Sequence, residues 1–101
     1  MPSVVAAVLE RDSRVLICRR RAEDPHPLKW EFPGGKMEPQ ETPFEALVRE
    51  IRDELGIEVV SAEEIERHEF QYPGRSPFLL IFFRVTEFEG EPRNLVFQEI
   101  R

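Results

Sequence analysis

The segment from Thr42 to Gly56 constrains the fold of this chain most, because the sequence marks both ends of a helix there. Thr42 and Glu45 have the spacing of a capping box, and Pro43 occupies the first helical position. Glycine at the position of Gly56 commonly ends a helix. Apolar side chains recur at helical spacing on one stripe: Phe44, Leu47, Val48, Ile51 and Leu55. We therefore predict one amphipathic helix over Thr42–Leu55.

Short apolar segments between turn residues surround this helix and predict a sheet. The predicted strands are Val4–Leu9, Val15–Cys18, Ile65–Tyr72, Phe78–Val85 and Leu95–Ile100, with short extended pieces at Trp30–Phe32 and Ile57–Val60. The polar turn Arg11–Arg14 joins the first two strands as a hairpin. The Glu-rich piece Ala62–Arg67 is open to a second interpretation, as helix. The pattern indicates an α/β (α+β) fold in a single domain, residues 1–101.

The segment Phe78–Phe83 is apolar at every position, which is typical of a strand that is covered on both faces. One amphipathic helix can cover only one face, so the chain is one layer short. We expect that the domain is incomplete at its C-terminus. The alternative is that the second face is a ligand pocket or a subunit contact, which leaves monomer and homodimer both open.

Composition excludes several classes of function. The formal net charge of −6 argues against a nucleic-acid polymer as the main partner, because domains that bind one usually carry a basic surface. The longest apolar run is too short to cross a bilayer and no secretory leader is visible, so we expect no membrane partner. Cys18 is the only cysteine, which rules out an intrachain disulfide and fits a reducing, cytoplasmic location.

Three carboxylates share one face of the predicted helix. Glu50, Asp53 and Glu54 stand at positions i, i+3 and i+4, where like charges repel unless a cation lies between them. Oxygen ligands of this kind suit Mg²⁺ or Mn²⁺. The alternative is a solvent-exposed charged face held by an Arg49–Asp53 pair. The glycine loop Phe32–Lys36, which ends in a cation and suits a phosphate group, favours the metal site.

From Gly35 onward the chain resembles the Nudix box, G-x5-E-x7-R-E-U-x-E-E-x-G-U, in which U is a bulky aliphatic residue. Gly35 is followed after five residues by Glu41, and after seven more by Arg49–Ile57, which reads REIRDELGI. Asp53 stands where the family has glutamate and is the one departure from the pattern. The wider chain is similar to MutT-type members of the family.

This resemblance implies a Nudix-type α/β/α sandwich with a mixed central sheet, in which a C-terminal helix missing from the 101 residues supplies the second helical layer. It also implies hydrolysis of a nucleoside diphosphate linked to another group. Glu50 and Glu54 would be the principal metal ligands and, with Arg49, the catalytic residues. Arg49 would orient Glu50, the carbonyl of Gly34 would be a further ligand, and Glu41 would support the site from behind.

On the substrate side, the resemblance places Lys36 against phosphate and Arg20 near the nucleotide. Gly35 belongs to the same substrate-binding loop. Phe32 is a candidate for stacking on the base, although core packing explains it equally well. Asp53 has a shorter side chain than glutamate, so we expect it to hold a second metal ion less well.

We expect Mg²⁺-dependent hydrolysis of a nucleoside triphosphate to the monophosphate and pyrophosphate, with Mn²⁺ as an alternative metal. An oxidised purine nucleotide is the first candidate substrate, and CTP or a nucleotide sugar remain open. A Nudix-like binding module that has lost catalysis is the second hypothesis. Outside the site, we predict a buried thiol at Cys18, a strand-surface residue at His68 and a solvent-exposed loop residue at His26.

Overall fold

The computed structural model describes residues 1–25 and 27–101, so His26 lies outside the described residues. Within those residues the structure has one helix, α1 (Pro43–Leu55). The strands are β1 (Ser3–Arg11), β2 (Arg14–Val15), β3 (Cys18–Arg19), β4 (Trp30–Glu31), β5 (Gly34–Lys36), β6 (Glu58–Phe70), β7 (Phe78–Glu89) and β8 (Glu99–Ile100). The predicted class, a mixed sheet with a single helix, is confirmed.

Helix α1 begins and ends as the sequence predicts. The Thr42 side chain accepts a hydrogen bond from the Glu45 amide, and the Glu45 carboxylate accepts one from the Thr42 amide, which completes the capping box. Gly56 adopts a left-handed conformation at φ 68° and its amide bonds to the Arg52 carbonyl. The buried side of α1 consists of Ala46, Leu47, Ile51 and Leu55.

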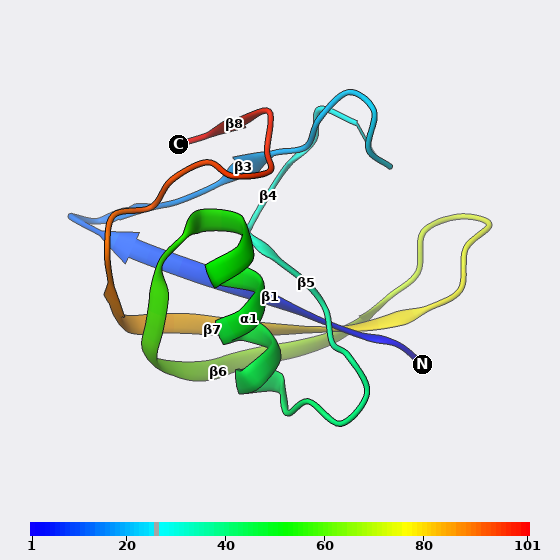
Figure 1. Ribbon diagram of the computed structural model, residues 1–101. Helices are drawn as coiled ribbons and strands as arrows, with labels where there is room; N and C mark the ends of the chain where they lie inside the picture. Colours follow the sequence, from blue (N-terminus) through cyan, green and yellow to red (C-terminus); the bar gives the residue numbers. More distant parts are fainter. Residues whose placement is uncertain (26) are drawn as a thin grey trace.

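The main sheet has the strand order β2-β1-β7-β6, and β5 also pairs with β1 (Figure 1). The sheet is mixed because β1 and β7 run parallel, whereas β6 pairs antiparallel with β7 and β5 antiparallel with β1. The hairpin β1–β2 turns at Asp12 and Ser13, which both have positive φ. A second, small sheet has the order β4-β3-β8.

The strand pattern differs from the sequence prediction at several points. The predicted strand Val15–Cys18 is divided between β2 in the main sheet and β3 in the small sheet, and the predicted pieces Ile57–Val60 and Ile65–Tyr72 belong to the single strand β6. The segment Ala62–Arg67 is strand, because β6 pairs with β7 along most of its length, so the helical alternative is wrong. The predicted strand Leu95–Ile100 shrinks to β8, Glu99–Ile100. The reason lies in Asn94, whose side chain bonds to both the amide and the carbonyl of Phe97 and closes a turn where the strand was expected.

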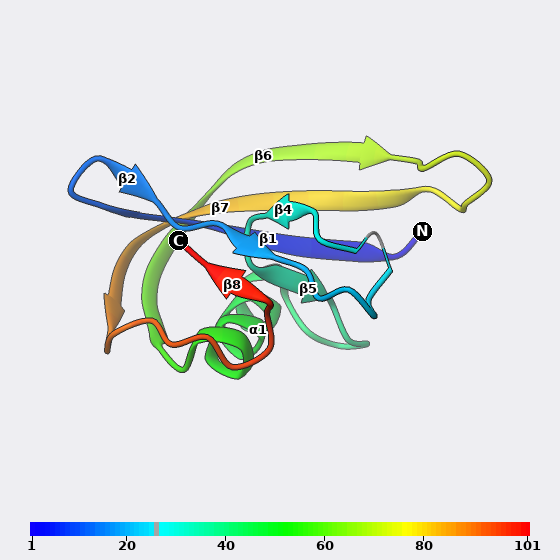
Figure 2. The ribbon, with the colours of Figure 1, turned by 90° about the horizontal axis from the view of Figure 1, so that it is seen from above.

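The two faces of the main sheet differ in what covers them. Seen from above, α1 lies on one side of β1, β7 and β6 (Figure 2). Ile81, Phe83 and Val85 of β7 point to this side and join the buried core, in which they are at most 5% exposed. The alternate residues Phe78, Leu80 and Phe82 line a groove on the other side. No helix within the described residues is long and apolar enough to cross a membrane.

Candidate active site

Strand β5 places the glycine loop against α1. The pairs Val4↔Lys36 and Ala6↔Gly34 fix β5 alongside β1, next to the helix. The Gly34 amide donates a hydrogen bond of 3.0 Å to Oε1 of Glu54. A Cβ atom added at Gly35 would overlap the Glu50 carboxylate, so glycine at this point lets strand and helix approach without displacing Glu50. The structure therefore brings the loop and both predicted ligands, Glu50 and Glu54, together.

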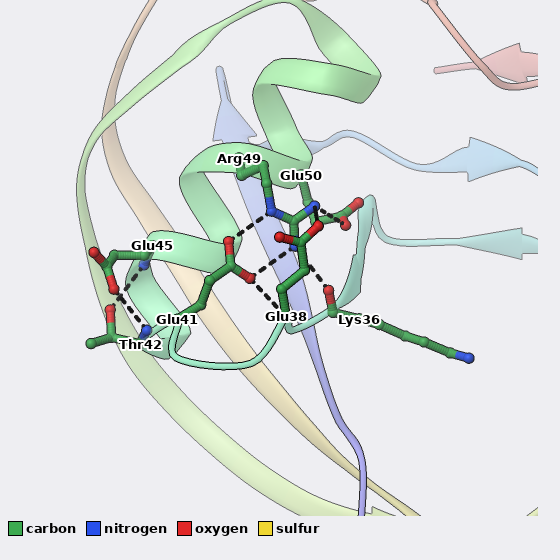
Figure 3. A network of polar contacts seen from close by, with 7 residues as sticks. All are labelled: Lys36, Glu38, Glu41, Thr42, Glu45, Arg49 and Glu50. Atoms are coloured by element: carbon green, nitrogen blue, oxygen red, sulfur yellow. Dashed lines mark hydrogen bonds and ion pairs between the residues drawn. The ribbon is translucent and has the colours of Figure 1, made fainter.

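Arg49 is the centre of a polar network that fixes Glu50 (Figure 3). Its Nη1 donates to Glu50 Oε1 at 2.7 Å, and its Nε donates to Glu41 Oε2 at 2.7 Å. Its Nη2 donates to Glu41 Oε1 at 2.9 Å and to the Lys36 carbonyl at 3.0 Å. One guanidinium thus ties the glycine loop, the loop that precedes α1 and Glu50 into one unit. The structure thus places Arg49 and Glu41 in contact as the resemblance implies, and their roles in a metal site stay predictions.

The same contacts shift the pKa values of the two partners in opposite directions. Hydrogen bonds from Arg49 and from the Glu38 amide hold the pKa of Glu41 down at about 2. The hydrogen bond to Glu41 raises the pKa of Arg49 above its ordinary value, and Glu50 adds to this effect. Glu41 and Arg49 therefore stay charged at neutral pH, which keeps the network intact.

Glu54 differs from its neighbours in its burial. Its pKa is raised to about 8, chiefly because burial penalises the charged carboxylate, while the Gly34 amide opposes this effect and the Glu50 charge adds to it. In the metal-free chain Glu54 therefore holds a proton at neutral pH. A divalent cation between Glu50 and Glu54 would stabilise the ionised form of both.

Asp53 lies apart from this pair. Its side chain is exposed, and its negative charge contributes to the raised pKa of Arg52. Arg49 turns to Glu41 and Glu50, so the Arg49–Asp53 pair of the alternative interpretation is absent from the contacts of the described residues. The assignment of Asp53 to a second metal ion stays a prediction.

The acidic pair fits one Mg²⁺ ion. Within residues 1–25 and 27–101, no three His, Cys, Asp or Glu side chains form a ligand cluster. Mg²⁺ uses one or two protein carboxylates and completes its octahedron with water and substrate phosphate, so Glu50 and Glu54 satisfy its needs. Because Gly35 has no side chain, the backbone of the glycine loop comes close to the Glu50 carboxylate.

A groove of about 1050 Å³ opens beside the glycine loop. Gly34, Gly35 and Lys36 line one part of it, and Arg20 and Phe32 line another. All the predicted substrate-binding residues thus face one hollow. Phe32 packs edge-on against Phe82, with ring centroids 6.3 Å apart, so it contributes both to packing and to the lining of the groove.

The structure also adds residues that the sequence did not single out. Glu31 lines the groove and accepts a hydrogen bond of 2.9 Å from Arg20 Nη1. Tyr72 and Arg75, at the tip of the β6–β7 hairpin, line its far end. The basic run Arg19–Arg21 indicated Arg20 as a candidate, but nothing in the sequence indicated its acidic partner Glu31. The two residues meet only because β3 and β4 pair after the intervening loop.

Of the three predictions outside the site, those for Cys18 and His68 agree with the structure, and the third, for His26, lies outside the described residues. Cys18 is fully buried, and burial is the main reason that its pKa rises to about 12, so its thiol stays protonated. His68 lies on the exposed face of β6, where its Nε2 is 2.8 Å from Glu66 Oε1.

Comparison with known proteins shows to which family the chain belongs. The NUDIX domain model matches residues 1–101. The chain is 47% identical over 90 residues to the CTP pyrophosphohydrolase of Escherichia coli (strain K12), covering 89% of the chain and 66% of that protein. It is 38% identical over 90 residues to the 8-oxo-dGTP diphosphatase of the same organism, covering 88% of the chain and 69% of that protein.

Solved structures agree with this result. The crystal structure of the MutT NUDIX hydrolase from Burkholderia pseudomallei superposes with a TM-score of 0.91 at 26% identity, over 99% of this chain and 80% of that one. The chain therefore belongs to the Nudix family of hydrolases and is of the MutT type. It spans about two thirds of the length of the two curated relatives. Nudix hydrolases generally use a divalent metal ion.

Proposed function

We propose that this chain carries a Mg²⁺-dependent activity that hydrolyses a nucleoside triphosphate to the monophosphate and pyrophosphate. The observation that carries the proposal is the contact of Glu50 and Glu54 with the glycine loop, which itself lines a groove together with Arg20 and Lys36. The cytoplasmic location expected from the single cysteine is part of this proposal.

Each residue of the site has a distinct task. Glu50 and Glu54 hold Mg²⁺, or Mn²⁺ in its place, together with the Gly34 carbonyl. Arg49 fixes the orientation of Glu50 through a charged hydrogen bond, while Glu41 holds Arg49 in place.

On the substrate side, Lys36 and Arg20 bind phosphate and nucleotide. The flexible amine of Lys36, at the end of β5, suits a mobile phosphate chain. The bound cation supplies charge neutralisation on the phosphates and a lowered pKa for the attacking water.

The base of the substrate would lie in the groove beyond the phosphates, against the apolar residues Phe32, Leu80 and Phe82. Two substrates follow from the relatives, CTP and 8-oxo-dGTP, in keeping with their names. An oxidised purine nucleotide remains the first candidate, and a groove of about 1050 Å³ has room for a bicyclic base. A nucleotide sugar is the alternative.

A panel of nucleotides tests the proposal directly. Pyrophosphate release is measured with CTP, 8-oxo-dGTP, unmodified nucleoside triphosphates and a nucleotide sugar, each with Mg²⁺, with Mn²⁺ and with chelator. We expect turnover with at least one triphosphate in the presence of metal and none in chelator. Tight nucleotide binding without turnover under any of these conditions would instead support the catalytically impaired binding module.

Asp53 tests the number of metal ions. If its short, exposed side chain holds a second ion poorly, then Asp53→Glu lowers the Mg²⁺ concentration needed for half-maximal activity. A metal titration of both forms measures this. An unchanged or weaker metal response in Asp53→Glu would reject the idea that Asp53 holds a second ion poorly, and Glu87→Asp, at an exposed strand position, serves as the control for a change of side-chain length.

A further inference from the structure

The residues 93–101, here termed the strap, connect the metal-binding helix with the opposite wall of the groove. The strap leaves β7, passes the C-terminal end of α1 and ends in β8 beside β3 (Figure 2). Both of its ends are held by backbone hydrogen bonds to elements that carry site residues.

At its first end the strap caps the helix. The Arg93 amide donates to the Leu55 carbonyl at 2.8 Å, and the Leu95 amide donates to the Glu54 carbonyl at 3.1 Å. These carbonyls belong to the last turn of α1, whose oxygens have no partner within a helix. The Arg93 guanidinium also lies directly over Gly56. The backbone of Glu54, a proposed metal ligand, is therefore bound to the strap.

At its second end the strap joins the small sheet. The Gln98 amide donates to the Arg19 carbonyl at 2.9 Å, and the Arg101 and Ile17 backbones exchange two hydrogen bonds of 2.9 Å. Arg19 directly precedes Arg20, which lines the groove. The Arg101 guanidinium lies 4.8 Å from the centre of the Trp30 ring in β4. The wall of the groove is thus bound to the strap as well.

Between these ends, Asn94 fixes the length and direction of the strap. Its Nδ2 donates to the Phe97 carbonyl at 2.9 Å, and its Oδ1 accepts from the Phe97 amide at 2.8 Å. The two bonds close a hydrogen-bonded ring over Asn94–Phe97, here termed the Asn94 ring. This ring lies between the segment that caps α1 and the segment that pairs with β3. Phe97 packs against the hydrophobic core, so the ring is anchored to the domain.

We propose that Asn94 is a positioning residue for the hydrolysis: its ring sets the distance between Glu54 on α1 and Arg20 beside β3, and thereby aligns the metal with the bound nucleotide. The inference rests on the proposed function, because it concerns the same site. Asn94 itself is not among the residues that line the groove. Its effect is carried by the backbone bonds at the two ends of the strap.

The test compares Asn94→Ala, which loses both bonds, with Asn94→Asp, which keeps the acceptor for the Phe97 amide. The matched control is Gln98→Ala, which removes an exposed amide side chain from the same strap; within the described residues that side chain makes no hydrogen bond. We expect Asn94→Ala to raise KM and the half-saturating Mg²⁺ concentration by about five- to 150-fold, the equilibrium shift of two lost hydrogen bonds. The kcat at saturation should stay within about twofold.

Asn94→Asp should recover part of this loss, and Gln98→Ala should match the unmodified chain. All assays are run well below the melting temperature of each variant. A lower melting temperature with unchanged KM and Mg²⁺ response in Asn94→Ala would overturn the proposal, because a purely structural residue behaves in that way.

Two readouts do not depend on activity. Trp30 is the only tryptophan, so its emission reports the contact with Arg101 and should shift in Asn94→Ala but not in Gln98→Ala. In the unmodified chain the Leu95 and Gln98 amides should exchange with solvent at one common opening rate, and independent rates would overturn the coupling even if the variant fails to fold. A chain that hydrolyses no nucleotide but meets both expectations refutes the proposed function and leaves the mechanical coupling standing.

Discussion

The Gly34 amide lies 3.0 Å from Oε1 of Glu54 and donates a hydrogen bond to it, which links the edge of the main sheet to the face of α1. This bond stabilises a carboxylate that is otherwise largely buried. The hydrogen bond lowers the pKa of Glu54, whereas burial and the nearby charge of Glu50 raise it. Burial has the larger effect, and the pKa of Glu54 is raised to about 8. Ionising Glu54 beside Glu50 therefore destabilises the folded chain when no cation is bound.

That cost predicts how stability depends on pH. The ordinary pKa of Glu54 is 4.5 and its folded-state pKa is about 8, so between these values the folded chain holds a proton that the unfolded chain has released. The unfolding free energy in chelator should therefore fall as the pH rises from about 5 to about 8. Mg²⁺ should reduce the fall, because it binds the ionised pair. Thermal unfolding followed by circular dichroism measures both.

The control for this prediction is Glu54→Gln, which cannot ionise and should remove most of the slope. Glu41 does not interfere, because its pKa is lowered to about 2 and its contribution is constant over this range. A chain whose stability in chelator rises between about pH 5 and pH 8 would contradict the prediction.

The two glycines of β5 predict two different kinds of damage. A Cβ at Gly34 would overlap the Val5 backbone, which cannot move without disturbing the sheet, whereas a Cβ at Gly35 would overlap the Glu50 carboxylate, which can swing aside. Gly34→Ala should lower the unfolding free energy by about 1–3 kcal/mol. Gly35→Ala should keep most of the stability and lose activity. Melting curves and turnover of both variants decide this, and equal effects on stability would contradict it.

Glu50→Gln tests the central carboxylate. The change keeps the shape of the side chain and its acceptor for Arg49 but removes the charge that binds Mg²⁺. We expect turnover to fall by roughly 10²–10⁴-fold with the fold preserved. Glu87→Gln, the same chemical change at an exposed strand position, should leave the rate unchanged. Comparable rates for Glu50→Gln and the unmodified chain would reject the role of Glu50.

Local signals made the helix predictable. The capping box of Thr42 and Glu45, together with Gly56, determines both ends of α1 from neighbouring residues alone. The spacing of Glu50 and Glu54 likewise places both carboxylates on one face. The pairing of Arg49 with Glu41 rather than Asp53 was less accessible from helix spacing, because it depends on how the preceding loop folds back.

Long-range contacts account for what the sequence did not predict. The Glu-rich part of β6 is a strand because β7 pairs with it. The residue pattern within the segment does not indicate that it has a pairing partner. The Asn94 ring replaces four residues of a predicted strand by a turn that depends on one side chain. Glu31 and Arg20 meet only once β3 and β4 have paired.

The unpartnered face of the sheet gives the last prediction. Phe78, Leu80 and Phe82 line the groove and are half-buried, since Phe32 covers Phe82 in part. Full burial of such side chains is worth about 1.5–3 kcal/mol each, so part of that stabilisation is missing in this chain. We expect the 101-residue chain to bind a hydrophobic dye and to associate at high concentration.

Neighbouring residues on β7 provide the matched test, because Leu80 faces the groove and Ile81 faces α1. Leu80→Ala should reduce dye binding with little loss of stability, since no buried contact is emptied. Ile81→Ala should cost about 2–5 kcal/mol, because Ile81 is 1% exposed and leaves a cavity. Dye fluorescence, melting temperature and mass in solution are measured for each form. A monomeric chain that binds no dye, melts cooperatively at high temperature and loses as much stability from Leu80→Ala as from Ile81→Ala would mean that the groove face is already packed.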